Sequence, residues 1–175
     1  MKTTLNKIRA HSPCKEGWEK LLKYLGKTKA DDEPLLLLTI LDSNGLDDAL
    51  WCFRAIDGRD KEIRLYAVWC ARQVQHLMRD PRSRAALDVA ERYANGEATA
   101  EELDAATVFF VALAAGLGLP GTADGAHLTA KMLLGGDARA AAGAAARKSA
   151  VWDAARVAQE ARLREVCNEV QGEKQ

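Results

Sequence analysis

The sequence contains no apolar run long enough to cross a membrane. Its longest such run, Val108 to Ala115 continued through Gly116 to Leu119, is shorter than the roughly 17 residues that a spanning helix needs. The start, MKTTLNKIRAHSPCKEGW, also lacks the apolar stretch of about 7 to 15 residues that marks a signal peptide. We therefore expect a protein that works in the cytoplasm and has no membrane partner.

A net charge is also absent, because 25 Lys and Arg balance 25 Asp and Glu. This balance removes the long-range attraction of a general nucleic-acid binder, so we expect no nucleic-acid partner. The charges are nevertheless unevenly placed. Residues 1–29 hold eight Lys and Arg against two acids, and residues 30–60 hold eight acids against two Arg. Such blocks either neutralise each other across the fold or polarise the surface toward a charged partner.

The cysteines show no C-x-x-C redox spacing, and a reducing cytoplasm keeps thiols unpaired. We expect all four to be free, small and buried: Cys14, Cys52, Cys70 and Cys167. Two of them follow a tryptophan directly, in Trp51-Cys52 and Trp69-Cys70. Because adjacent residues of a helix point about 100° apart, neither pair can face one site together. The repeated dipeptide predicts large side chains packed against small ones in a core.

Metal-ligand spacing is nearly absent. His11 and Cys14 form a lone H-x-x-C, while His76 and His127 have no Cys, Asp or Glu at ligand spacing. We expect no metal and no cofactor. A Cys-His nucleophile stays open as an alternative, because such partners meet only in the folded chain. The G-x-G-x-x-G pattern within residues 116–121 follows no expected strand and is not interpreted as a phosphate loop.

Helix signals recur along the whole chain, and alanine is frequent in its second half. Thr99 with Glu102 spells a capping box. The expected helices run from Ser12-Pro13 to Gly26, from Asp32-Glu33-Pro34 to Asn44-Gly45, from Leu46 to Phe53, from Asp60 to Leu77, from Asp80-Pro81 to Asn95-Gly96, from Thr99 to Leu113, around Leu128 to Leu134, and from Asp137 onward.

These signals predict an all-α fold of about seven or eight helices. The helices would form a single compact bundle or a short α-α superhelix with a long Ala-rich C-terminal helix. We expect one domain over residues 1–175, with a hinge at 116–125 between an N-terminal helical core (12–115) and a C-terminal segment (126–171). That hinge holds Gly118, Pro120 and Gly121.

Two acidic clusters are the candidate contacts with a partner. Their members are Asp31, Asp32 and Glu33, then Asp47 and Asp48. One interpretation is that they only interact favourably with helix N-termini. The other is an acidic face that meets a basic partner surface. The loop at 116–125 is a second candidate contact.

Four segments resemble a widespread group of small bacterial and phage immunity proteins: SPCKEGWEKLL, DDEPLLLLTILDSNGLDDALWCFRA, RLYAVWCARQV and DPRSRAALDVAERYANGEATAEEL. The resemblance covers roughly residues 12–106. The relatives carry Ala-rich pentads toward the C-terminus, and SAVWDAARVA (Ser149–Ala158) is similar to one such unit. Residues 107–148 depart from that pattern.

The resemblance implies a helical, non-enzymatic protein that neutralises a toxin by binding it, with no catalytic residues to carry over. Similar proteins in prophages imply an alternative, an inhibitor of a host defence system of the anti-CRISPR type. Two further classes stay open: an enzyme or nucleotide binder with a pocket invisible in sequence, and a homodimer paired through the C-terminal helix.

Overall fold

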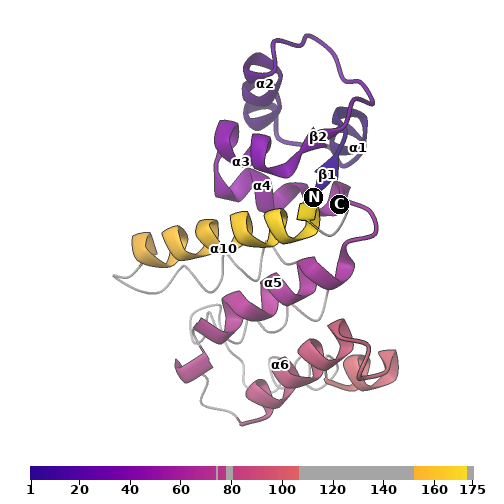
Figure 1. The fold of residues 1–175 in the computed structure, drawn as a ribbon, viewed down its shortest axis with the longest axis vertical. Coiled ribbons are helices and arrows are strands. Elements are labelled where there is room, and N and C mark those ends of the chain that lie inside the picture. The colour runs from indigo at the N-terminus through magenta and orange to yellow at the C-terminus, as the bar shows by residue number, and fades with distance from the viewer. Residues whose placement is uncertain (74, 78–80, 107–151, 173–175) are drawn as a thin grey trace. The chain divides into compact units, whose positions relative to one another are not determined.

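The computed structural model describes residues 1–73, 75–77, 81–106 and 152–172, and these residues form an all-α fold with almost no strand (Figure 1). The predicted fold class is therefore confirmed. The chain divides into two compact units: unit 1 comprises Met1–Arg59 with Glu160–Gln175, and unit 2 comprises Asp60–Gln159. The first boundary lies between the helix predicted to end at Phe53 and the helix predicted to begin at Asp60. The expected hinge at 116–125 lies outside the described residues.

Unit 1 begins with a very short strand, which pairs with a second one that follows helix α2 (Lys15–Tyr24) in the chain. Strand β1 (Lys2–Thr3) pairs antiparallel with β2 (Leu35–Leu36), with Thr3 opposite Leu35. The helices that follow are α1 (Leu5–Ala10), α2 (Lys15–Tyr24), α3 (Leu37–Asn44), α4 (Leu46–Trp51) and a 3₁₀ turn (Cys52–Ala55). The C-terminal part of α10 (Trp152–Gly172) completes the unit.

The helix expected to begin at Asp32-Glu33-Pro34 therefore begins only at Leu37. Met1 and Thr3 are buried, so their polar groups need partners inside the protein. The amide of Leu37 donates to the carbonyl of Met1 at 3.2 Å, and the Thr3 hydroxyl donates to the carbonyl of Ala55. A long-range demand for hydrogen bonds thus overrides the local helix signal.

Helix α2 also begins later than the predicted Ser12-Pro13 start. Ser12 has φ 54°, in the left-handed region, and its amide donates to the carbonyl of Arg9 in α1. Ser12 therefore ends α1, and the cap of α2 is Cys14, whose Sγ accepts from the amide of Gly17 at 3.4 Å. This finding corrects the burial prediction too, since Cys14 is exposed.

The core of unit 1 collects aliphatic side chains from almost every element. The largest fully buried members are Leu5, Ile8, Leu37, Ile40 and, from α10, Leu163. On the surface of the same unit, the Arg164 guanidinium of α10 pairs with Asp42 of α3 at 2.7 Å. The C-terminal part of α10 therefore docks one face on this unit, which agrees with the helical spacing of its buried residues, Leu163, Val166, Cys167 and Val170.

Unit 2 is built on helices α5 (Asp60–Gln73) and α6 (Pro81–Ala94), which pack against each other. Between them lies a 3₁₀ turn (Gln75–Leu77). The helical spacing of apolar residues from Ile63 to Leu77 predicts an apolar stripe on α5, and this stripe is buried at Tyr66, Ala67, Cys70 and Ala71. Ile63, at the start of the stripe, is only half-buried, and Val74 and the Leu77 side chain lie outside the described part. Beside the core, Arg72 pairs with Asp88 at 2.7 Å and Glu91 at 2.6 Å, which joins α5 to α6.

The capping box predicted at Thr99 and Glu102 is present. The Glu102 amide donates to the Thr99 hydroxyl at 3.2 Å, and the Thr99 amide donates to the Glu102 carboxylate at 2.8 Å. The Thr99 amide, followed by the Arg92 side chain, lowers the pKa of Glu102. A helix accordingly starts at residue 100 and is described to residue 106.

Thr99→Ala is expected to lower the free energy of unfolding by about 1 kcal/mol, because an N-cap hydroxyl is lost. Urea unfolding measures this change. Thr99→Ser keeps the hydroxyl and is the matched control, with a smaller expected effect. Equal stability of the alanine and wild-type chains would contradict a role for the cap.

Every helix in the part of the chain that the structure describes is too short or too polar to span a membrane.

Candidate functional site

Three of the four thiols lie in the interior. Cys52, Cys70 and Cys167 are buried, and burial raises the pKa of each thiol, to about 12 for Cys52 and Cys70. A thiol must lose its proton to act as a nucleophile or a metal ligand. The interpretation of these thiols as core filler is therefore supported for Cys52, Cys70 and Cys167. Cys14 instead caps α2 at the surface.

The tryptophans of the two Trp-Cys pairs are only half-buried. The Arg54 guanidinium lies over the Trp51 ring, 4.4 Å from its centroid. The expectation that Trp51 and Trp69 lie inside the core was therefore too strong. The dipeptide places the small thiol in the core and the large ring at its edge, because neighbours on a helix point in different directions.

The histidines that the structure describes, His11 and His76, are both exposed, and His127 lies outside the described residues. Within the described ranges, no three His, Cys, Asp or Glu side chains come together as metal ligands. The cysteine beside His11 in sequence, Cys14, is engaged by the Gly17 amide.

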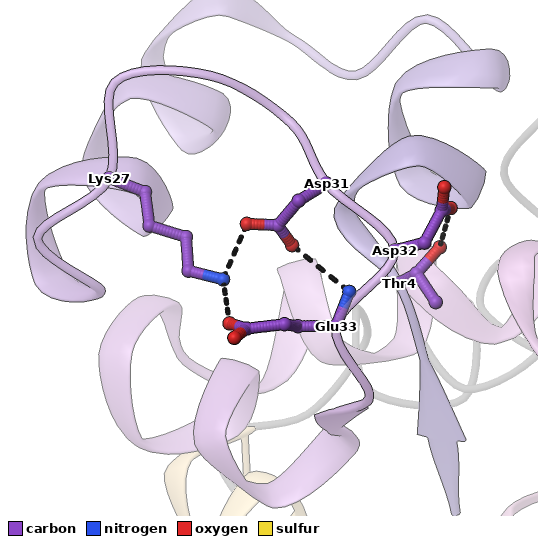
Figure 2. Close-up of polar contacts among 5 residues, drawn as sticks. All are labelled: Thr4, Lys27, Asp31, Asp32 and Glu33. Atoms are coloured by element: carbon purple, nitrogen blue, oxygen red, sulfur yellow. Dashed lines mark hydrogen bonds and ion pairs between the residues drawn. The ribbon is translucent and has the colours of Figure 1, made fainter.

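The first acidic cluster, Asp31 to Glu33, forms a loop that we call the acidic loop (Figure 2). Lys27 reaches across it, pairing with Asp31 at 2.6 Å and with Glu33. The Asp31 carboxylate also accepts from the amide of Glu33 at 3.2 Å, and its carbonyl accepts from the amide of Asn6 at 3.0 Å. These contacts tie the loop to Lys27 and, through Asn6, to α1.

Asp32 points to the other side of the acidic loop, toward the Thr4 hydroxyl at 3.5 Å (Figure 2). At that distance the hydrogen bond is weak, and Asp32 remains exposed. Glu33 is also exposed, whereas Asp31 is half-buried. The loop therefore uses Asp31 to fix its own structure and presents Asp32 and the outer part of Glu33 to solvent.

Lys27 lowers the pKa of Asp31, chiefly through their hydrogen bond, and the same bond raises the pKa of Lys27. A carboxylate with a lowered folded-state pKa stabilises the fold above its ordinary pKa. That contribution disappears as the pH falls through the lowered value. The acidic loop should consequently lose its anchoring in acid.

Lys27→Met is expected to move the pKa of Asp31 up toward its ordinary value, because the charge goes while the aliphatic stem stays. Carboxyl NMR titration measures this shift. The stability difference from wild type should be present at neutral pH and shrink in acid. Lys23→Met, an exposed lysine of α2, is the control. An Asp31 titration curve unchanged by Lys27→Met would exclude the ion pair.

The second acidic cluster lies at the start of α4. The Asn44 side-chain amide donates to the Asp48 carboxylate at 2.8 Å and to the carbonyl of Gly17 at 2.8 Å. A Cβ atom at Gly17 would lie 2.7 Å from the Asp48 carboxylate, so α2 and α4 approach closely here. Asp48 therefore joins helices, and its neighbour Asp47 is exposed.

The five predicted contact residues thus divide into two kinds. Asp31 and Asp48 are half-buried and hold local structure, whereas Asp32, Glu33 and Asp47 are exposed. The other candidate contact, the loop at 116–125, lies outside the described residues. Sequence reasoning missed the positioning roles of Lys27 and Asn44. The i, i+4 spacing of Lys27 and Asp31 was a signal of the usual helical kind, yet here the pair closes a loop.

Comparisons of the chain with protein-family models, with curated proteins and with solved structures found no match. The similarity to immunity proteins accordingly stays a prediction from the sequence.

Proposed function

We propose that this protein binds another protein through unit 1 and neutralises it by occlusion, without turnover. The observation that carries the proposal is the anchored acidic loop. Lys27 and the Asn6 amide fix the backbone while Asp32 stays exposed. A surface that is ordered before binding loses less conformational entropy when a partner docks. Charged groups held in place also favour a partner of opposite charge.

Two further observations support a binding function. The raised pKa values of Cys52 and Cys70 count against thiol chemistry at those positions. The sequence resemblance to immunity proteins points to the same mode of action. Four free cysteines fit a reducing compartment, and we propose that the protein works in the cytoplasm.

The experiment that tests this function is affinity capture of the full chain from its native host, with mass spectrometry of what is retained. The captured protein is then purified and assayed with increasing amounts of this chain. Occlusion requires that its activity fall in proportion to the molar ratio and stop at a fixed stoichiometry. Inhibition by far less than one equivalent would indicate turnover and would overturn the proposal. The identity of the partner distinguishes toxin immunity from inhibition of a defence system.

The acidic surface is tested with a double charge reversal, Asp32→Lys with Asp47→Lys. Both side chains are exposed, and Asp31 and Asp48 keep their structural contacts. We expect partner binding to weaken at least about tenfold. The control is Glu97→Lys with Asp104→Lys, which makes the same charge change at exposed positions of unit 2. If the two double variants bound the partner equally well, the acidic surface would be excluded as part of the interface.

A further inference from the structure

A groove of about 480 Å³ opens on the surface of unit 1, on the side of α2 that the core does not cover. Its charged residues are all cations: Arg9 from the end of α1, Lys15 from the start of α2, and Lys29 from the loop that follows α2. Trp18 and Leu22, one helical turn apart on α2, supply apolar surface. We call this feature the basic groove.

The cations of the basic groove are engaged only weakly by acids of the fold. In the part of the chain that the structure describes, Arg9 and Lys29 have no carboxylate within ion-pair distance, and Lys15 reaches Glu19 only at 3.9 Å. Lys27 differs sharply from them, because it holds two carboxylates at once. Three positive charges therefore face one groove with little compensation.

The apolar side chains of the groove are not covered by the core. Helix α2 is strongly amphipathic, yet Leu21 is its one fully buried residue. Trp18 and Leu22 are half-buried and line the groove. An aromatic ring that lines a cleft is a frequent anchor point in protein interfaces. Cations around it would guide an anionic group toward the ring.

We propose that the basic groove is the docking site for an acidic segment of the partner protein, one that carries an apolar or aromatic side chain beside its carboxylates. The apolar side chain would pack on Trp18 and Leu22, and the carboxylates would pair with Arg9, Lys15 and Lys29. This inference rests on the proposed function, since it names the surface and the chemistry of the same kind of partner.

The charges favour a peptide over a compact phosphate. Phosphate sites commonly use backbone amides at a helix N-terminus, and at the start of α2 the amide of Gly17 is already bonded to Cys14. The groove instead offers three separate side chains from three segments. Separate cations suit carboxylates spaced along an extended chain.

The groove is also continuous with the acidic loop. Residues Thr28 to Ala30 line the groove, and the acidic loop begins at the next residue. A partner with an acidic segment beside a basic patch could therefore contact both surfaces, with opposite charges paired at each. The sequence already indicated this arrangement, because the basic block of residues 1–29 is followed by the acidic block of residues 30–60.

The test uses a display library of short random peptides selected on the full chain. Selected peptides are counter-selected on the double variant Arg9→Glu with Lys29→Glu. The control is Lys20→Glu with Lys23→Glu, which makes the same charge change at exposed α2 positions outside the groove. We expect enrichment of Asp and Glu flanking an apolar residue. A synthetic selected peptide should bind the groove variant at least about tenfold more weakly and the control variant unchanged.

Two further measurements show whether the peptide binds in the basic groove. Its affinity should fall as salt increases, because exposed ion pairs are screened. The indole N–H signal of Trp18, assigned with Trp18→Phe, should shift during an NMR titration with the peptide. Circular dichroism and urea unfolding of each variant check that the variant keeps the fold.

Selected peptides without acidic enrichment, or peptides that bind the groove variant as well as the wild type, would overturn the inference. ATP and a thymidine oligonucleotide are titrated in parallel. Binding of either that depends on Arg9 and Lys29, without acidic peptides, would assign the groove to nucleotides instead.

The experiments distinguish two outcomes: that the basic groove is not the docking site, and that the protein does not act by occlusion. If the groove variant captures and inhibits the partner like wild type, the groove is excluded and occlusion stands. If the wild-type chain binds acidic peptides in the groove but inhibits no captured protein, the proposed function fails.

Discussion

Leu163→Ala is expected to lower the free energy of unfolding by about 2–5 kcal/mol, the largest effect of a single substitution proposed for this chain. Leu163 lies on α10 and is fully buried within unit 1. Removing its side chain loses apolar burial and leaves a cavity that tight packing fills only in part. Urea or thermal unfolding followed by circular dichroism measures the loss.

The control for this substitution lies on the same helix. Val157 is 69% exposed, so Val157→Ala should change stability by no more than about 0.5 kcal/mol. A similar small effect of both substitutions would mean that α10 is not docked through Leu163. A large effect of Leu163→Ala alone would confirm that α10 is packed into the fold through Leu163.

The second large effect concerns thiol reactivity. Cys52 and Cys70 have pKa values near 12 against an ordinary 9.0, so at neutral pH their thiolate fraction is lower by about three orders of magnitude. Cys14 is the exposed member of the four. We expect a disulfide reagent to modify one cysteine of the folded protein rapidly and the others only after unfolding in guanidinium.

Two variants identify the reactive group. Cys14→Ser should abolish the fast phase and keep a hydroxyl near the Gly17 amide, so α2 retains a cap. Cys70→Ala should leave the fast phase unchanged. Rapid modification of two or more thiols in the folded chain would contradict the interior placement of Cys52, Cys70 and Cys167. It would then reopen the question of a nucleophile.

Local signals account for the parts of the fold that were predicted correctly. The capping box at Thr99 needs only contacts three residues apart, and the α5 stripe needs only helical spacing. Both follow from rules that act within one or two turns. The expectation of little sheet holds in the described residues, where β1 and β2 are the strands.

Long-range contacts account for the parts that differed. Leu35 and Leu36 pair with Lys2 and Thr3, more than thirty residues away, although the apolar run continued a helix pattern. The cap of α2 moved from Ser12 to Cys14 because Ser12 closes the preceding helix. Local propensities do not predict these differences, because the residue that forms the competing contact lies on another element.

The sequence by itself determined the helical class of this protein, its buried apolar stripes and the separation of its basic and acidic blocks, because these depend on residue type and spacing. The tertiary structure alone decided which charged side chains have a partner within the fold. It paired Lys27 with the acidic loop and joined Asp48 to Asn44, and it left Arg9 and Lys29 facing a groove beside Trp18. A charge is neutralised by whatever the fold places within a few ångströms of it, and distance in space is not written in the order of residues.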